Sequence, residues 1–165
     1  NVRDCVSASY MGGGATAAGG TVNITDCAFT QTGFYDWNSC IASASGNTGV
    51  VNIANSTGTS EGYGLYIFSS GGTINVYGGT YTAVKDVLRI DIDSNSYPTA
   101  EGFINVYGGV FDGTISIANT DKAHLNIVAG EFKNTGLSLE QFSQYVAAGS
   151  TVTESGDTFI VTAQQ

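Results

Sequence analysis

An asparagine between two aliphatic residues recurs along this chain and limits the folds it can adopt. It occurs at residues 22–24, 51–53, 74–76, 104–106 and 125–127, and residues 1–5 match residues 23–27. The copies lie roughly 20 to 30 residues apart, a spacing typical of repeat proteins in which each repeat is one supersecondary unit. We therefore expect one stack of similar coils, and further protein before Asn1.

Each repeat holds two more short runs after the asparagine segment. Glycines such as Gly78 and Gly79 follow it and indicate a sharp corner, because glycine accepts positive φ. A run with one aromatic residue comes next, then an alternating run such as residues 65–67, 88–90 or 115–117. Three strands per repeat predict an all-β, three-sided solenoid of about six coils, with the strand spacing of a stacked sheet.

Alternation along each strand predicts which side chains face the interior. Successive side chains point to opposite faces, so the aliphatic residues should be buried and the asparagines should face outward. An antiparallel sandwich would also give short strands and glycine turns. It would not predict the same tripeptide at one place in every repeat, so the solenoid is favoured.

The last part of the chain breaks the repeat. Ser138 and Gln141 have the spacing of a helix capping box. Leu139, Phe142, Tyr145 and Val146 would share one helical face, and Gly149 would end the helix. Residues 151–161 then resemble a β-hairpin. We expect solenoid coils over residues 1–137 and a helix-and-hairpin cap over residues 138–165, which would cover the last coil.

The repeats at residues 72–81 and 103–111 resemble those of right-handed parallel β-helices, the pectate-lyase-like superfamily. More narrowly, they are similar to repeats in surface proteins of gut bacteria and in the fibres or spikes of their phages. The resemblance implies a right-handed, single-stranded β-helix. It implies no particular activity, because this fold carries lyases, hydrolases, adhesins and inert scaffolds alike.

The strongest candidate for catalysis is a charged strand at residues 85–93. Leu88, Ile90 and Ile92 should point inward, which leaves Arg89, Asp91 and Asp93 on the outer face. Two carboxylates and a cation could bind calcium or act as acid and base. The matching outer positions of the neighbouring coils are Tyr66 and Ser116, so no further charge supports a catalytic site. A solvated face with a local ion pair is the simpler interpretation.

The single histidine, His124, should lie on the outer face near Asn126. No serine, cysteine or aspartate pattern around it indicates a catalytic triad, so a surface histidine is the simpler interpretation. We expect no catalytic residues, no resident metal and no cofactor.

Aromatic residues give a second functional candidate. Tyr35 and Trp37 lie in the first long insertion, and Tyr63 and Tyr66 lie in or near later ones. Exposed aromatic rings beside carboxylates and amides are typical of sugar-binding sites. The alternative is that these rings pack a loop onto the coil.

The outward asparagine face is a third candidate. It should carry Asn75 and Tyr77 on one coil and Phe103, Asn105 and Tyr107 on the next. Tyr77 and Tyr107 would stack as neighbours, and an aromatic patch on a flat face can mediate trimer formation or lateral packing. Isolated exposed tyrosines are the alternative.

Cys5 and Cys27 occupy the same place in consecutive repeats. Adjacent coils would bring their Cα atoms within disulfide range, so either a disulfide or a stacked pair of buried thiols is expected. Cys40 is left without a partner in this scheme.

The charge and hydropathy of the chain argue against two classes of partner, nucleic acids and membranes. The formal net charge is −9, which opposes binding to nucleic acids and to anionic membranes, and no apolar run is long enough to span a bilayer. The sequence favours a non-catalytic structural or adhesive module of a bacterial surface protein, or of a phage fibre or decoration protein. Its location would be extracellular, at the cell surface or on a virion. A carbohydrate-binding module is the alternative, and a polysaccharide lyase or glycoside hydrolase is the third hypothesis.

Overall fold

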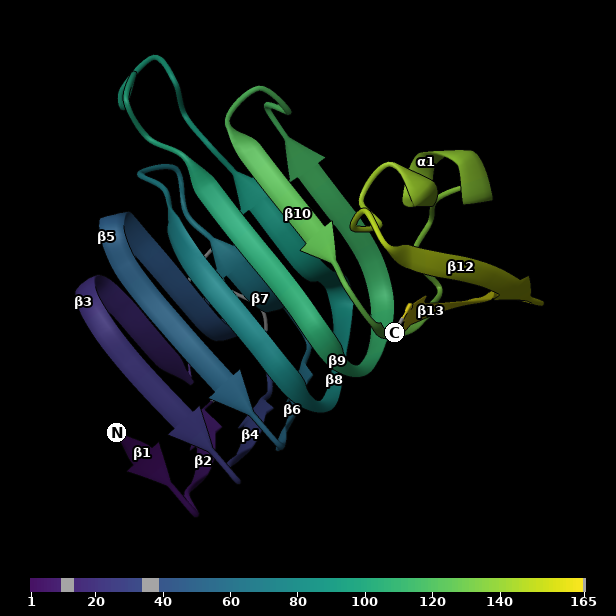
Figure 1. Ribbon diagram of the computed structural model, residues 1–165. Coiled ribbons are helices and arrows are strands. Elements are labelled where there is room, and N and C mark those ends of the chain that lie inside the picture. Colours follow the sequence, from purple (N-terminus) through teal and green to yellow (C-terminus); the bar gives the residue numbers. More distant parts are fainter. Residues whose placement is uncertain (10–13, 34–38, 165) are drawn as a thin grey trace.

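The computed structural model describes residues 1–9, 14–33 and 39–164. It is almost entirely β, with one short helix near the C-terminus. Most strands belong to one large, mostly parallel sheet whose path of paired strands has β1 at one end and β12 at the other. In Figure 1 the N-terminal strands lie at one end of the molecule, and α1 with the last two strands lies at the other.

The asparagine segments pair with one another in parallel and in register. Asn23 is opposite Asn52, Asn52 is opposite Asn75, and the series continues through Asn105 to Asn126. Their strands are β1 (Val2–Arg3), β3 (Ala15–Thr25), β5 (Cys40–Ala54), β8 (Gly72–Asp91), β9 (Gly102–Ala118) and β10 (Ala123–Ile127). This register confirms that the tripeptides mark equivalent positions, and the parallel pairing makes the antiparallel sandwich wrong.

The asparagine side chains form a hydrogen-bonded ladder on the outside of this series. The amide of Asn75 donates to Asn52 at 2.8 Å, and the amide of Asn105 donates to Asn75 at 2.9 Å. The aliphatic neighbours point the other way, and Ile53, Ile74 and Val106 are completely buried. The predicted facing of the strand is therefore confirmed.

A second parallel series follows the corner after each asparagine segment. It joins β2 (Val6–Ser9), β4 (Ala28–Gln31), β6 (Ser56–Ser60), the middle of β8 and β9, and β11 (Gly130–Lys133). The predicted aromatic residues lie in register here, and Tyr81, Phe111 and Phe132 form a buried stack with centroids 5.4 and 4.9 Å apart. In β6 the equivalent position is Gly58. A Cβ there would lie 2.7 Å from the side chain of Ile41, so an aromatic residue does not fit.

The corner residues themselves are only partly glycine. Asp4, Asp26 and Asn55, each three residues after a repeat asparagine, have φ values of 52, 54 and 47°. Asp and Asn tolerate this left-handed conformation better than other non-glycine residues. The next repeat has Gly78 at this place, with φ of 125°.

A third parallel series is formed by the first half of β5, β7 (Tyr63–Ile67) and the last parts of β8 and β9. Leu65, Leu88 and Ile115 are in register and buried. On the opposite face Tyr66, Arg89 and Ser116 are in register, as expected from the sequence. This outer row positions the candidate site described below.

The C-terminal segment contains the expected helix and hairpin. The Ser138–Gln141 capping box is present at the start of α1 (Leu139–Ser143). The strands β12 (Ser150–Ser155) and β13 (Thr158–Ala163) pair antiparallel, and β13 also pairs antiparallel with β11. The hairpin thus extends the sheet beyond the last parallel strand.

Two expectations about the helix are wrong. Gly149 does not end it, because α1 ends six residues earlier at Ser143, and Gly149 lies in the turn before β12. Leu139 is exposed, whereas Phe142 is completely buried. One helical turn is too short to present four apolar residues on one face.

Candidate functional site

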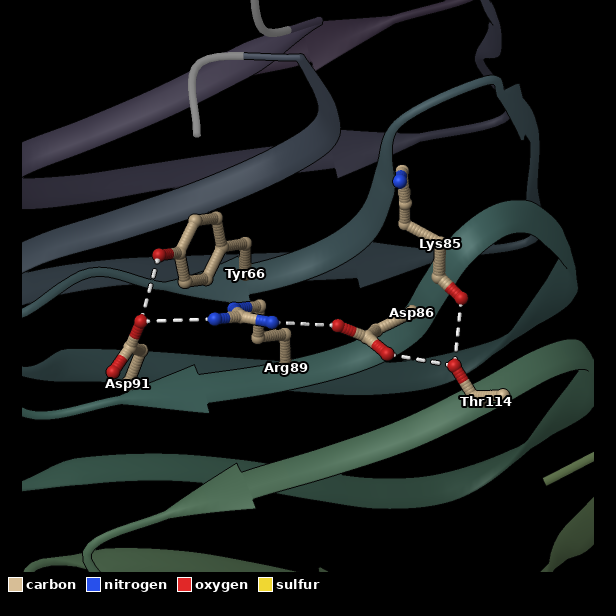
Figure 2. A network of polar contacts seen from close by, with 6 residues as sticks. All are labelled: Tyr66, Lys85, Asp86, Arg89, Asp91 and Thr114. Carbon is tan, nitrogen blue, oxygen red and sulfur yellow. Dashed lines mark hydrogen bonds and ion pairs between the residues drawn. The ribbon is translucent and has the colours of Figure 1, made fainter. Parts of the chain in front are cut away.

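The charged strand forms an ion-pair network on the outer face of β8. Arg89 contacts Asp86 at 2.8 Å and Asp91 at 3.0 Å, so both terminal guanidinium nitrogens are paired with carboxylates (Figure 2). Leu88 and Ile90 point into the core with no exposed surface. Burial alone would lower the pKa of Arg89, but hydrogen bonds from its guanidinium to the two aspartates raise that pKa above its ordinary value.

Aromatic rings of β7 cover the arginine. Tyr66 is the direct parallel neighbour of Arg89, and the guanidinium carbon lies 4.9 Å from the ring centroid of Tyr63 and 5.6 Å from that of Tyr66. These distances allow cation–π attraction. The Tyr66 hydroxyl is 3.5 Å from Asp91, and burial raises the pKa of Tyr66 to about 12, so it remains a protonated donor.

The other end of the network is anchored on β9. The hydroxyl of Thr114 lies 2.6 Å from Oδ1 of Asp86 and 2.7 Å from the backbone carbonyl oxygen of Lys85 (Figure 2). Thr114 and Asp86 are opposite each other in the parallel register. Side chains from three neighbouring strands therefore fix the position of Arg89.

A hollow of about 390 Å³ opens beside this network. Its lining residues are Tyr66, Phe68, Ser69, Asp91 and Asp93. The rings of Tyr66 and Phe68 are 4.3 Å apart between centroids, with an angle of 37° between their planes. The hollow thus combines an apolar aromatic wall with two carboxylates and a hydroxyl group.

Asp93 is held by the turn that follows β8. Oδ1 of Asp93 accepts hydrogen bonds from the backbone N–H groups of Asn95 and Ser96, at 3.0 and 3.2 Å. Hydrogen bonds from Ser96, through its side chain and its backbone, lower the pKa of Asp93. Asp93 therefore stays ionised at neutral pH.

The geometry gives little support to acid–base catalysis. A general acid needs a carboxyl group that remains protonated near the working pH, whereas Asp93 has a lowered pKa and Asp91 is paired with Arg89. No group of three or more metal-ligating side chains occurs in the described part of the chain.

Two separate sequence predictions meet at this place. Tyr63 and Tyr66, predicted to bind a ligand, lie against Arg89 and Asp91, the fallback catalytic residues. The expectation that Tyr66 is exposed is wrong, because only 5% of its surface is accessible. Tyr35 and Trp37 lie outside the described residues.

Sequence reasoning missed three contributors, Asp86, Phe68 and Ser69. Strict alternation would have put Asp86 on the buried face with Leu88. The register of β8 against β9 shifts around Asp86, so Val87 and Leu88 are both buried and Asp86 turns outward. Phe68 continues the outward alternation from Tyr66, and that signal was available in the sequence.

The predicted interaction face is assembled around the asparagine ladder. The rings of Tyr77 and Tyr107 are stacked 5.0 Å apart with 6° between their planes, and their exposed fractions are 52% and 45%. Phe103 stacks on His124 at 4.8 Å, which confirms the outward position of the histidine. These two stacks flank the hydrogen-bonded pair Asn75 and Asn105.

Cys5 and Cys27 are free thiols in the structure, and Cys27 is buried whereas Cys5 is partly exposed, so they do not form the expected pair of buried thiols. The backbone N–H of Cys5 points to the sulfur of Cys27 at 3.4 Å, so the two residues are neighbours in adjacent repeats. Cys40 is a separate buried thiol on β5.

No family model, curated protein or solved structure matches this chain. The resemblance to pectate-lyase-like β-helices therefore remains an expectation from the repeats. Within the described residues, no helix has both the length and the apolar character needed to cross a membrane.

Proposed function

We propose that this chain is a non-catalytic structural or adhesive module built as a right-handed, three-sided β-solenoid of about six coils. The three parallel strand series, each with equivalent residues in register, support this architecture. Such a rod presents long flat faces to solvent, which suits a surface protein of a bacterium or a fibre or decoration protein of a phage. An extracellular or virion location follows from this proposal.

The ion pairs of Arg89 support a non-catalytic role. Both terminal nitrogens of this side chain contact carboxylates, and Thr114 fixes one of those carboxylates. A residue that must stabilise charge in a transition state needs a donor directed at the reacting atoms. Here each terminal nitrogen directs an N–H group at one of the protein's own aspartates.

Carbohydrate binding is the second candidate, and one observation favours it. The hollow beside β8 places the rings of Tyr66 and Phe68 next to Asp91, Asp93 and Ser69. Sugar rings stack their C–H faces on aromatic side chains and donate hydroxyl hydrogen bonds to carboxylates. An adhesive module that holds a glycan in this hollow would satisfy both candidates.

Binding to immobilised glycans, combined with a reducing-sugar assay on the same glycans, tests the proposal. We expect retention without release of sugar, loss of retention in Phe68→Ala, and unchanged retention in the control Tyr77→Ala on the asparagine face. Circular dichroism would verify that both variants fold. Sugar release that disappears in Asp91→Asn would instead establish an enzyme, and retention unaffected by Phe68→Ala would remove the hollow as the binding site.

A further inference from the structure

We infer that the hollow beside β8 selects a positively charged sugar, one with a free amine, over neutral and acidic sugars. This inference rests on the carbohydrate-binding candidate above and names its ligand class. It is carried by the charges, the hydrogen bonds and the rings that line the hollow.

The charged groups that line the hollow are both negative. Asp91 and Asp93 contribute carboxylates, while Ser69 and the two rings are neutral. Asp93 remains ionised because the Ser96 side chain and backbone hydrogen-bond to it. A uronate would place its carboxylate beside these two and would be repelled, whereas an ammonium group would be attracted.

Arg89 cannot reverse this preference. Its terminal nitrogens are paired with Asp86 and Asp91, its Nε is buried, and it is not one of the lining residues. An anionic ligand in the hollow would therefore meet the carboxylates of Asp91 and Asp93 and not the guanidinium. The network and the hollow together hold three aspartates, Asp86, Asp91 and Asp93, and two cationic side chains, Arg89 and Lys85, so the negative charges outnumber the positive ones by one.

One carboxylate oxygen of Asp91 can still accept a hydrogen bond. Tyr66 and Arg89 both contact its Oδ2 atom. Within the described residues, no hydrogen bond uses its Oδ1 atom, which is therefore available to an ammonium donor. A hydrogen bond between two charged groups is stronger than a neutral one, so an amine would gain more here than a hydroxyl group.

The aromatic wall favours a sugar ring bearing the amine. The partly exposed ring of Phe68 can attract a cation as well as the C–H groups of a pyranose, and the buried Tyr66 supports that ring. The hollow, at about 390 Å³, falls in the size range of small-molecule sites and exceeds what a single lysine side chain would fill. An amino sugar uses both the volume and the charge.

Three oligosaccharide probes of equal length separate the possibilities by calorimetry: a glucosamine oligomer, its N-acetylated form, and a galacturonate oligomer. We expect the amine form to bind about tenfold or more tightly than the acetylated form, and the uronate not to bind. The preference should shrink in salt and disappear when the pH is raised through the pKa of the ligand's own amine.

Single substitutions test whether the hollow causes the preference for the amine form. Asp93→Asn keeps an acceptor for the turn and should reduce the preference for the amine form several-fold. The matched control Asp157→Asn, on the exposed turn between β12 and β13, should leave it unchanged. Equal binding of the amine and acetylated forms, or binding of the uronate, would overturn the charge selection while the carbohydrate proposal survives. Failure of all three probes and of the immobilised glycans would overturn the carbohydrate proposal itself.

Discussion

The ring of Phe142, from the C-terminal helix, packs 5.2 Å from the ring of Phe132, from the last parallel strand. Phe132 is itself stacked on Phe111, and Phe142 contacts Phe159 of the hairpin at 4.5 Å. One column of aromatic rings therefore continues from the repeats into the C-terminal segment. The apolar end of the repeat stack is covered by residues that continue its own packing.

Truncating Phe142 should destabilise the whole protein. Phe142→Ala removes a completely buried ring from the column, and we expect a loss of about 3–5 kcal/mol in the free energy of unfolding. Urea denaturation followed by circular dichroism measures it. Leu139→Ala, in the same helix but at an exposed position, is the control and should cost about 0.5 kcal/mol or less. Equal effects of the two changes would mean that the helix does not cover the core.

Replacing one amide of the asparagine ladder by a carboxylate should weaken the fold in a pH-dependent way. In Asn75→Asp the donor to Asn52 is lost and an acceptor faces an acceptor, which should cost about 1–3 kcal/mol at neutral pH. This environment disfavours the charged form, so the pKa of the new carboxyl group is raised in the folded state. Stability should therefore recover as the pH falls through that raised pKa, because the protonated acid can donate again.

The control for this experiment is Gln164→Glu, the same amide-to-carboxylate change at an exposed position. Thermal unfolding of both variants between pH 3 and pH 8, roughly the range that spans ordinary and raised carboxyl pKa values, provides the comparison. A pH profile of Asn75→Asp that parallels the control would show that the ladder's hydrogen bonds contribute nothing to stability.

The register of the repeats was predictable because it depends on local rules that act in every repeat. Alternation fixes the facing of Asn75, and alternation within residues 65–67, 88–90 and 115–117 puts Tyr66, Arg89 and Ser116 in one row. The outward turn of Asp86 was not predictable in the same way. It follows from a register shift between neighbouring strands, which depends on how β9 packs against β8 and not on the pattern within either strand.

The composition of the hollow and of the ion-pair network beside it was predictable only in pieces. Arg89, Asp91 and Tyr66 were each identified from the sequence, but for two different functions. Their meeting depends on the parallel neighbour relation between β7 and β8. The sequence did not predict the length of α1 or the exposure of Leu139. The extent of a helix of one turn depends more on tertiary contacts than on its own apolar pattern.

Cys40 should be the least reactive of the three thiols. Burial raises its pKa to about 11, so little thiolate is present near neutral pH, and its surface is almost inaccessible. Iodoacetamide labelling read by mass spectrometry should modify Cys5 first and Cys40 only after unfolding in urea. Rapid labelling of Cys40 in the native protein, with Cys40→Ser identifying the peptide, would contradict its burial.

The stacked pair Tyr77 and Tyr107 should mediate lateral self-association. Two parallel rings on a flat face, each about half exposed, form an apolar patch that a second copy can cover. We expect light scattering to show that the wild type forms oligomers as its concentration rises, and that these are trimers if the chain belongs to a fibre. The double variant Tyr77→Ser/Tyr107→Ser should remain monomeric. The matched control is Val84→Ser, because Val84 is also exposed but lies outside the asparagine segments. Oligomers that persist in the tyrosine variant would place the contact elsewhere, and a monomeric wild type at high concentration would remove self-association as the role of this face.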